Sequence, residues 1–224
     1  MIAVAADAHI GEREETLPAF LEALERLAEA RPSHFIVLGD LFRFFIGLPG
    51  WASFEHEEVF ARIRKVKAAG AITAYIEGNR DFFLKDPALK TAFDAVGPAF
   101  EAEVSGVRIL FIHGDTINRG EWRYRTWRAF SKSGFTYGLT RILPRPLLLP
   151  LYRWTERRLQ HTNFQYRKEV PIGAVKEFAG RQTADAVVLG HYHREFEETV
   201  GTVKVFGLPA FKDTRRLWEW EPSR

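Results

Sequence analysis

The sequence predicts an α/β fold that combines a parallel core sheet, a second sheet and a helical segment inserted between strands. Short apolar runs alternate with amphipathic helical segments up to about residue 97, which is the order of a parallel sheet with right-handed crossovers. A hairpin pattern then begins, in which two strands are separated by Ser105-Gly106. Between residues 119 and 168, prolines divide a basic and aromatic stretch that predicts helices outside the sheets.

Three strands and three helices form the predicted parallel part. Apolar and β-branched runs bounded by glycine or polar residues indicate the strands, and apolar residues at helical spacing indicate the helices. Thr16 is expected to cap the first helix, and Gly70 stands where a helix C-terminus favours glycine. In chain order we expect a strand at 2–6, a helix from Thr16 towards Pro32, a strand at 35–38, a helix at 54–69, a strand at 71–76 and a helix at 87–95.

The second half is predicted to contain mainly strands. The runs at 100–104 and 107–112 form the hairpin, and a helix at 170–180 leads to a strand at 185–189. The runs at 195–200 and 203–206 are joined by a tight turn, and the alternation at 215–221 predicts a last strand.

Composition excludes several kinds of site. The 224 residues include no cysteine, so the chain has no disulfide, no thiolate metal site and no thiol nucleophile. Any metal would therefore have imidazole and oxygen ligands. The conspicuous apolar run at 147–151 is too short to span a bilayer. No charged region and long apolar region precede the first strand, so we expect no secretory signal. We expect a cytoplasmic protein.

Basic residues are concentrated in one segment. Residues 119–168 hold 12 Lys and Arg against 2 Glu, a local charge of +10, whereas the rest of the chain carries −7. Such asymmetry marks a surface that faces a polyanion, a phosphate group or an anionic membrane. We expect residues 119–168 to form a helical cap inserted into a body made of residues 1–118 and 169–224. Alternatively, the segment is a plain helical hairpin whose ten aromatic residues form a core and whose arginines are solvated.

Polar side chains follow five of the predicted strands. Taken singly these motifs are weak, although Gly-His-x-His is more specific because its two imidazoles point the same way. The carboxyl ends of strands in α/β sheets form one edge, where ligands bind. His34, His56 and His161 lie outside the motifs and are expected to be structural. We expect a metal site formed by Asp7, His9, Asp40, Asn79, His113, His191 and His193.

The order of these motifs resembles that of the calcineurin-like metallophosphoesterase superfamily. The resemblance implies a four-layer αββα sandwich and two divalent metal ions. Mn²⁺ is the expected ion, although the ligand types do not exclude Fe, Co, Ni or Zn. Two metals about 3.5–4 Å apart can activate water and hold phosphoryl oxygens during in-line attack. The resemblance assigns Asp7, His9 and His193 to one metal, Asn79, His113 and His191 to the other, and Asp40 to both.

Arg80 and Asp81 are expected to be catalytic together with Asp40. Arg80 stands where many superfamily members have a histidine that protonates an alkoxide leaving group. Arginine stays protonated at any useful pH, so Arg80 cannot be that acid, but it can stabilise charge on a phosphoryl group. This favours a leaving group that is already a weak base, as in a pyrophosphate linkage. Asp81 is expected to support a metal ligand or the arginine.

A closer resemblance is to the UDP-2,3-diacylglucosamine hydrolase family of lipid A biosynthesis. It rests on Gly-Asp-Leu-Phe at 39–42, Gly-Asn-Arg-Asp-Phe-Phe-Leu at 78–84 and His-Gly-Asp-Thr at 113–116. The resemblance implies cleavage of a nucleotide-linked glycolipid to UMP and a lipid sugar 1-phosphate, a cap that holds acyl chains, and peripheral association with the inner membrane. Arg43 departs from the family, which commonly has an acidic residue there, and the start of the cap also differs. The expected substrate-binding residues are Asn79, Arg80, Arg119, Arg123, Tyr124, Trp127 and Arg128.

Two other functions remain possible from the residues alone. A phosphodiesterase or phosphatase acting on soluble nucleotides or nucleic acid could stack bases on the interleaved arginines and aromatics of the cap. A scaffold protein could keep the fold and use the cap for protein contacts, but such proteins often lose metal ligands, and none is missing here. We expect no nucleic acid and no obligate protein partner, but rather a glycolipid substrate and a membrane surface that meets the cap.

Overall fold

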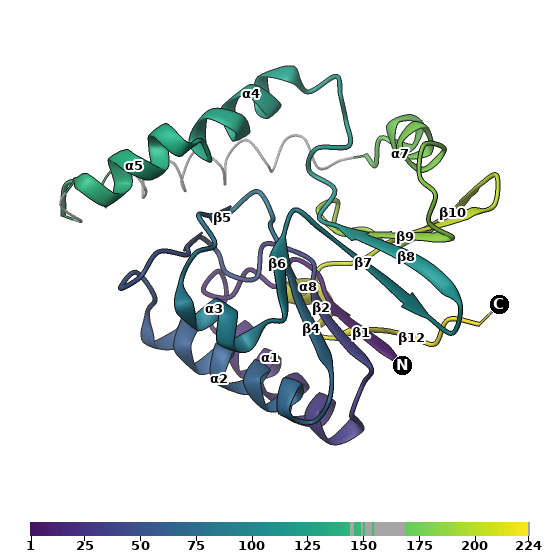
Figure 1. Cartoon of the computed structure of the whole chain (residues 1–224), viewed down its shortest axis with the longest axis horizontal. Coiled ribbons are helices and arrows are strands. Elements are labelled where there is room, and N and C mark those ends of the chain that lie inside the picture. Colours follow the sequence, from purple (N-terminus) through teal and green to yellow (C-terminus); the bar gives the residue numbers. More distant parts are fainter. Residues whose placement is uncertain (144–145, 149, 151–153, 155–168, 224) are drawn as a thin grey trace.

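The protein is built around two five-stranded sheets that pack face to face (Figure 1). The computed structural model describes residues 1–143, 146–148, 150, 154 and 169–223. The first sheet has the order β12-β1-β2-β4-β6, and the second has the order β10-β11-β9-β8-β7. The strands of the first sheet are β1 (Ile2–Ala5), β2 (His34–Val37), β4 (Ile72–Ile76), β6 (Ala95–Gly97) and β12 (Trp218–Trp220). Those of the second are β7 (Ala99–Val104), β8 (Val107–Ile112), β9 (Ala186–Leu189), β10 (Phe196–Val200) and β11 (Val203–Gly207).

Helices cover the outer faces of both sheets. Three of them, α1 (Thr16–Ala30), α2 (Phe54–Ala68) and α3 (Pro87–Ala92), lie against the first sheet, and α7 (Ile172–Ala179) lies against the second (Figure 1). Three apolar clusters fill the three interfaces between these layers. In β1, for example, Ala3 and Ala5 face the helices whereas Ile2 and Val4 face the other sheet. The predicted αββα sandwich is therefore confirmed, and burial on both faces explains why its parallel strands are continuous apolar runs.

Local signals account for most element boundaries. The predicted turn Ser105-Gly106 has φ values of 53° and 74°, the left-handed pair that a two-residue hairpin needs. Helix α2 begins with a reciprocal cap between Ser53 and His56, and Gly70 follows it with φ of 109°.

Two sequence-based expectations are corrected, and some short elements were not predicted. The helix predicted at 87–95 ends at Ala92, because Ala95–Gly97 pair with β4 as a parallel edge strand. Thr16 does not cap α1: Glu15 occupies the N-cap, and the buried Thr16 hydroxyl has no partner among the described residues. The short pair β3 (Phe45–Ile46) and β5 (Asp81–Phe82) and the short helix α8 (Phe211–Thr214) went unpredicted, since such short elements show no periodicity.

Part of the described chain lies outside the four layers. Helices α4 (Trp122–Ser131) and α5 (Gly134–Ile142) extend over the edge of the sandwich at the top of Figure 1. They fall within the predicted cap. The predicted limit of that cap at residue 168 lies outside the described residues, as do His161 and most of the cap residues after 150. Within the described part of the chain, no helix is both long and apolar enough to cross a membrane.

Candidate metal centre

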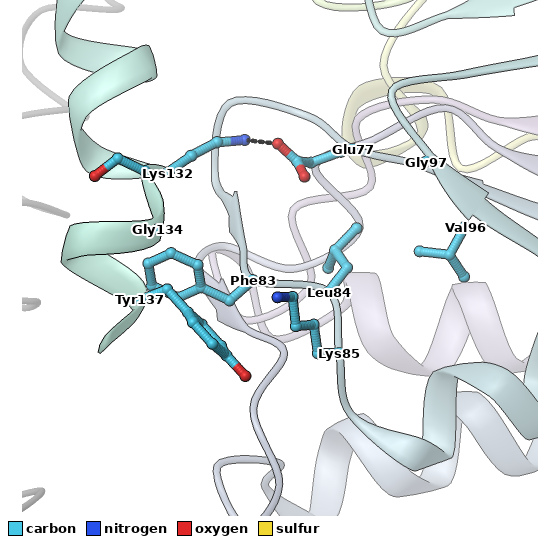
Figure 2. Close-up of a pocket in the computed structure, with 10 residues that line it drawn as sticks. Glu77, Phe83, Leu84, Lys85, Val96, Gly97, Lys132, Gly134 and Tyr137 are labelled. Atoms are coloured by element: carbon cyan, nitrogen blue, oxygen red, sulfur yellow. Dashed lines mark hydrogen bonds and ion pairs between the residues drawn. The ribbon is translucent and has the colours of Figure 1, made fainter. Parts of the chain in front are cut away.

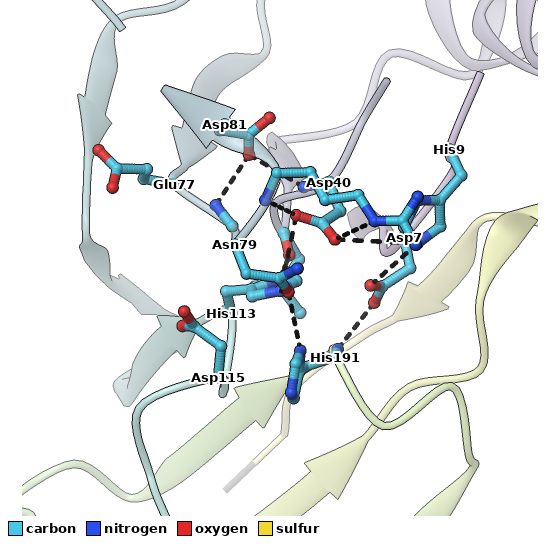
Figure 3. Close-up of polar contacts among 12 residues, drawn as sticks. Asp7, His9, Asp40, Glu77, Asn79, Asp81, His113, Asp115 and His191 are labelled. Atoms are coloured by element: carbon cyan, nitrogen blue, oxygen red, sulfur yellow. Dashed lines mark hydrogen bonds and ion pairs between the residues drawn. The ribbon is translucent and has the colours of Figure 1, made fainter. Parts of the chain in front are cut away.

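Strands β1, β2 and β4 of the first sheet and β8 and β9 of the second end at the same edge of the sandwich. Polar side chains that follow these strands point into one common space (Figure 3). The structure thus brings together all seven residues that the sequence predicts as metal ligands. They are Asp7 and His9 after β1, Asp40 after β2, Asn79 after β4, His113 after β8, and His191 and His193 after β9.

The first half-site consists of Asp7, His9 and His193. Their ligand atoms lie within 4.8 Å of one another. Asp7 Oδ1 is 3.1 Å from His193 Nε2 and 3.7 Å from His9 Nε2. The other Asp7 oxygen accepts a hydrogen bond of 2.8 Å from the backbone N–H of His191, which holds the carboxylate in place. One carboxylate and two imidazoles around one point are suitable ligands for a divalent transition metal.

The second half-site consists of Asn79, His113 and His191. Asn79 Oδ1 lies 3.1 Å from His113 Nε2 and 3.1 Å from His191 Nδ1. On the other side of the His113 ring, Nδ1 lies 2.8 Å from the Leu38 carbonyl oxygen, to which its N–H donates. This bond leaves Nε2 of the neutral ring as a ligand directed at the centre.

Asp40 lies between the half-sites. Its Oδ2 is 3.9 Å from His9 Nε2, whereas its Oδ1 is 3.8 Å from His113 Nε2, so each carboxylate oxygen faces a different half-site. Asp40 is fully buried, yet within the described structure its Oδ2 has no hydrogen-bond partner. A buried carboxylate oxygen is costly unless a donor or a cation lies beside it, and the nearby Nε of Arg80, at 3.6 Å, donates no hydrogen bond to it. The arrangement therefore fits a bound divalent metal.

Strained backbone is concentrated at this edge. Among the described residues, nine non-glycine residues have positive φ, and five of them are predicted metal ligands. Positive φ is uncommon outside glycine and persists where the surrounding structure imposes it, often at functional sites. The five are Asp7, His9, Asp40, His191 and His193, with φ between 46° and 66°.

Glycines allow the loops to approach one another. A Cβ on Gly39, whose φ is +82°, would lie 2.5 Å from the Nδ1 of His113. A Cβ on Gly78 would overlap the carboxylate of Asp40. Only glycine therefore fits before Asp40 and before Asn79, which explains the Gly-Asp and Gly-Asn pairs in physical terms.

The histidines of the centre show its electrostatic character. Burial, followed by the charge of Arg80, lowers the pKa of His9 to about 4. Burial, followed by the charge of His113, lowers the pKa of His191 to about 4. Both rings are therefore neutral at physiological pH and their lone pairs are available to a metal. Burial also lowers the pKa of His113, but Asp40 and Asp7 outweigh it and raise that pKa above its usual value, which shows that the field here favours a cation.

Asp81 supports the centre from behind. Its Oδ2 accepts hydrogen bonds from the backbone N–H groups of Asp40 at 3.0 Å and Gly78 at 2.8 Å, and its Oδ1 accepts one from the Tyr75 hydroxyl at 2.9 Å. Burial and then the charge of Asp40 raise the pKa of Asp81 to about 6. The carboxylate thus joins the two loops that carry Asp40 and Asn79.

Arg80 lies beside the centre with its guanidinium held from one side. Its Nη1 donates to Glu12 Oε1 at 2.7 Å, and Glu12 Oε2 in turn accepts from Lys212 Nζ at 2.6 Å. Its Nε is 3.6 Å from Asp40 Oδ2 and has no hydrogen-bond partner among the described residues. Sequence reasoning missed Glu12 and Lys212. Glu12 follows the Asp-x-His motif closely, but nothing in the sequence connects Lys212 with it.

The predicted substrate-binding residues of the cap divide into two groups. Tyr124 and Arg128 donate hydrogen bonds to Asp115, which is itself buried. Arg119, Arg123 and Trp127 are exposed, and the Arg123 guanidinium lies 5.5 Å from the centre of the Trp122 ring. Their role in binding substrate stays a prediction. Sequence reasoning also missed Asp115, Glu77 and Lys132, although Asp115 belongs to the quoted His-Gly-Asp-Thr motif.

Comparison with known proteins agrees with this geometry. The family model described as calcineurin-like phosphoesterase matches residues 1–195. The UDP-2,3-diacylglucosamine hydrolase of Proteus mirabilis is 29% identical over 224 residues, covering 97% of this chain and 91% of the relative. The enzyme of the same name from Photorhabdus laumondii is 30% identical over 200 residues, covering 87% and 82%. A solved archaeal phosphodiesterase aligns at 14% identity with a TM-score of 0.49, over 94% of this chain and 84% of that one. The chain belongs to the calcineurin-like phosphoesterase family and is a metal-dependent phosphoesterase.

Proposed function

We propose that this protein is a two-metal pyrophosphohydrolase that cleaves UDP-2,3-diacylglucosamine, or a closely related nucleotide-linked glycolipid. One water adds across the P–O–P bridge, so that one phosphoryl group leaves as UMP and the other stays on the sugar as the 1-phosphate. The names of the relatives from Proteus mirabilis and Photorhabdus laumondii support the substrate. The buried Arg80 beside Asp40 is the observation that carries the type of reaction.

The two half-sites would hold two divalent cations, Mn²⁺ being our first choice, with Asp40 shared between them. When bound, the ions supply Lewis-acid activation of water and neutralise charge on the phosphoryl oxygens. Asp40 lowers the repulsion between two neighbouring cations, because its carboxylate lies between the half-sites. Asp81 keeps the Asp40 and Gly78 backbones in register through its two backbone hydrogen bonds.

Arg80 determines which leaving group suits the centre. Its guanidinium keeps its proton and cannot deliver one, so an alkoxide would leave without help. A phosphate leaving group needs charge stabilisation rather than a proton, and the unpartnered Nε can donate a hydrogen bond to a phosphoryl oxygen. Arg80 thus favours a pyrophosphate over an alkyl phosphodiester.

The cap offers an apolar and basic surface for the rest of the substrate. On α4 and α5 the exposed side chains include Trp122 (64%), Phe130 (56%), Phe135 (71%) and Ile142 (82%). Exposed aromatic and aliphatic residues beside arginines are typical of contact with acyl chains and anionic headgroups. We propose that the cap, over residues 119–168, meets the acyl chains and the inner membrane surface, and that the protein is cytoplasmic and associates peripherally with that membrane.

The experiment is UMP release from UDP-2,3-diacylglucosamine in the presence of Mn²⁺, with Asp40→Ala as the blank. Metal-dependent release that is absent from the blank supports the proposal. If the lipid substrate is inert while an aryl phosphodiester is cleaved, the substrate proposal is wrong and a soluble nucleotide or nucleic acid becomes the better candidate.

Arg80→His is the matched variant for the leaving group. Histidine supplies an acid and removes the permanent charge, so hydrolysis of the pyrophosphate should fall while hydrolysis of an alkyl phosphodiester rises. Equal losses on both substrates would contradict the role that we assign to Arg80.

A further inference from the structure

Helix α4 contacts two of the three loops that carry ligands of the second half-site, the loop after β4 and the loop after β8. Its Arg128 Nε donates to Asp115 Oδ2 at 2.6 Å, and its Nη2 lies 3.4 Å from Glu77 Oε1. Lys132, which follows the helix, donates from Nζ to Glu77 Oε1 and to the Gly78 carbonyl, both at 2.6 Å. Together with Tyr124, which donates to Asp115, these residues recur every four positions and so form one face of the helix. We call this face the α4 anchor: Tyr124, Arg128 and Lys132.

The partners of the α4 anchor are adjacent to metal ligands. Asp115 follows His113 by two residues, and Glu77 precedes Asn79 by two residues (Figure 3). Each peptide link is planar and leaves two free dihedral angles per residue, so fixing residues 77, 78 and 115 strongly limits where Asn79 and His113 can lie. Among the described residues, the α4 anchor makes no direct side-chain contact with the loop after β1, which carries Asp7 and His9.

These contacts, rather than apolar packing, hold α4 against the body. The structure describes every residue of α4 and of α5, and the only buried ones are Ser131 in α4 and Thr140 in α5. A cavity of about 270 Å³ opens at the junction, between Lys132 and Glu77 on one side and Tyr137 and Lys85 on the other (Figure 2). Tyr137 supplies an apolar contact, with its ring 5.5 Å from that of Phe83. A junction with so little buried apolar surface depends on its ion pairs for its geometry.

The side chains of these ion pairs are largely shielded from solvent. The side chain of Asp115 is 3% exposed, that of Lys132 10% and that of Arg128 20%. Shielded pairs are less screened by salt than pairs on the open surface and have better defined geometry. The α4 anchor therefore defines the positions of the two loops to which it binds.

We propose that Arg128 and Lys132 are positioning residues that set the metal affinity of the second half-site, so that docking of the cap and occupancy of one metal position are coupled. The inference rests on the proposed function, because it assumes that each half-site binds its own ion. The coupling is reciprocal: an interaction that stabilises the contacts of α4 with the body strengthens metal binding at Asn79, His113 and His191, and metal binding there stabilises the contacts of α4.

The test is a calorimetric titration of the metal-free full chain with Mn²⁺. The variants are the double substitution Arg128→Met with Lys132→Met, and Arg125→Met as the matched control, which removes an exposed charge from the same helix. We expect two ions on the original protein and on the control. In the double variant one ion should bind about 10- to 100-fold more weakly, the range seen when groups that hold metal ligands are removed. Arg128→Lys, which keeps one charge toward Asp115, should recover part of the affinity.

Two backgrounds identify the half-site. In His193→Ala, which damages the first half-site, the double substitution should still weaken the remaining ion. In His113→Ala, which damages the second, it should leave the remaining ion unchanged. Equal effects in both backgrounds, or none in either, would overturn the inference.

Two further readouts separate the possible failures. If the double variant loses its thermal transition, Glu77→Gln replaces it, because this change removes the negative charge that Arg128 and Lys132 share and keeps the shape of the side chain. Unchanged Mn²⁺ binding in Glu77→Gln overturns the inference. If the original protein binds only one ion, the two-metal function fails. The inference then stands only if that ion is lost in His113→Ala and weakened by the double substitution.

Discussion

The two half-sites of the metal centre have similar ligands but different supports. The first, with Asp7, is held within the body: a backbone N–H of the β9 loop fixes its carboxylate. The second, with Asn79, depends on loops that are also bound by α4 through Glu77 and Asp115. The first half-site is thus held by contacts within the sandwich, whereas the second is held both by contacts within the sandwich, from Leu38 and Asp81, and by contacts from the cap.

This difference teaches how one fold can combine stable metal binding with a response to substrate. A ligand set held by strand ends is preorganised, whereas a set whose loops contact a loosely packed helix can change when that helix moves. Asp40 faces both half-sites, so a change in the position of one half-site also changes the electrostatic environment of the other.

The largest effect should come from Asp40, because its two carboxylate oxygens face the two half-sites of the metal centre. Asp40→Asn keeps the shape of the side chain but removes the shared charge. We expect both Mn²⁺ ions to bind weakly and the turnover rate to fall by about 10³-fold or more, the upper range for loss of one preorganised electrostatic group. Calorimetry and UMP release measure the two quantities. Near-normal activity in Asp40→Asn would contradict the role of Asp40 as the ligand shared by the two half-sites.

The next effect should separate the halves. His193→Ala and His113→Ala each remove one imidazole, from the first and the second half-site respectively. Each variant should retain one ion and lose turnover by about 10²-fold. Bound manganese per chain, measured by elemental analysis after gel filtration, checks this expectation. Loss of both ions from both variants would show one indivisible cluster rather than two half-sites.

A smaller effect should come from Glu12, which holds Arg80 but faces neither half-site as a ligand. Glu12→Gln weakens the charged hydrogen bond to Arg80 Nη1, so the guanidinium is less well oriented. We expect turnover to fall by about 10-fold, well within the effect of a misplaced catalytic group, with metal binding unchanged. Lys212→Met should act in the same direction but more weakly, because it releases only the other oxygen of Glu12. A loss of metal from Glu12→Gln would show that the residue supports the ligands instead.

The smallest effect lies outside both halves, at His56. Burial lowers the pKa of His56 to about 4, and its Nδ1 accepts a hydrogen bond from the Ser53 N–H. The unfolded chain has the ordinary pKa of 6.5 at this position, so between pH 6.5 and pH 4 the unfolded state binds more protons than the folded state. His56 therefore contributes stability above pH 6.5 that is lost as the pH falls towards 4.

Chemical denaturation across this pH range, with saturating Mn²⁺, measures the effect. The free energy of unfolding should fall by roughly 1–3 kcal/mol from this residue, since one pKa unit corresponds to about 1.4 kcal/mol. His56→Gln is the control, because glutamine at this helix position preserves the reciprocal cap without a titrating group. An identical pH slope in the variant would show that the acid sensitivity arises from other groups, such as His34, whose pKa burial also lowers.

Much of the centre could be predicted from the sequence because each ligand follows a strand. Asp7 and Asp40 end apolar runs that are buried on both faces, and such strands cannot be placed elsewhere in an α/β sheet. The short pair Phe45–Ile46 and Asp81–Phe82 could not be predicted, because two residues carry no periodicity. The edge strand Ala95–Gly97 was missed for a related reason: three residues carry little periodicity, and pairing with β4 makes them a strand.

By itself the sequence determined the strands of the two sheets except β6, the side chains that stand at their ends and therefore which chemistry the centre offers. These features follow from local hydrophobic patterning and from the chemistry of individual residues. Only the tertiary structure decided that Glu12 accepts from both Arg80 and Lys212, and that Arg128 and Lys132 reach Asp115 and Glu77. These partners are 13 to 200 residues apart in the chain, so no local pattern records them. Their contacts exist because packing of the two sheets, and of α4 over their edge, brings distant loops within hydrogen-bonding distance.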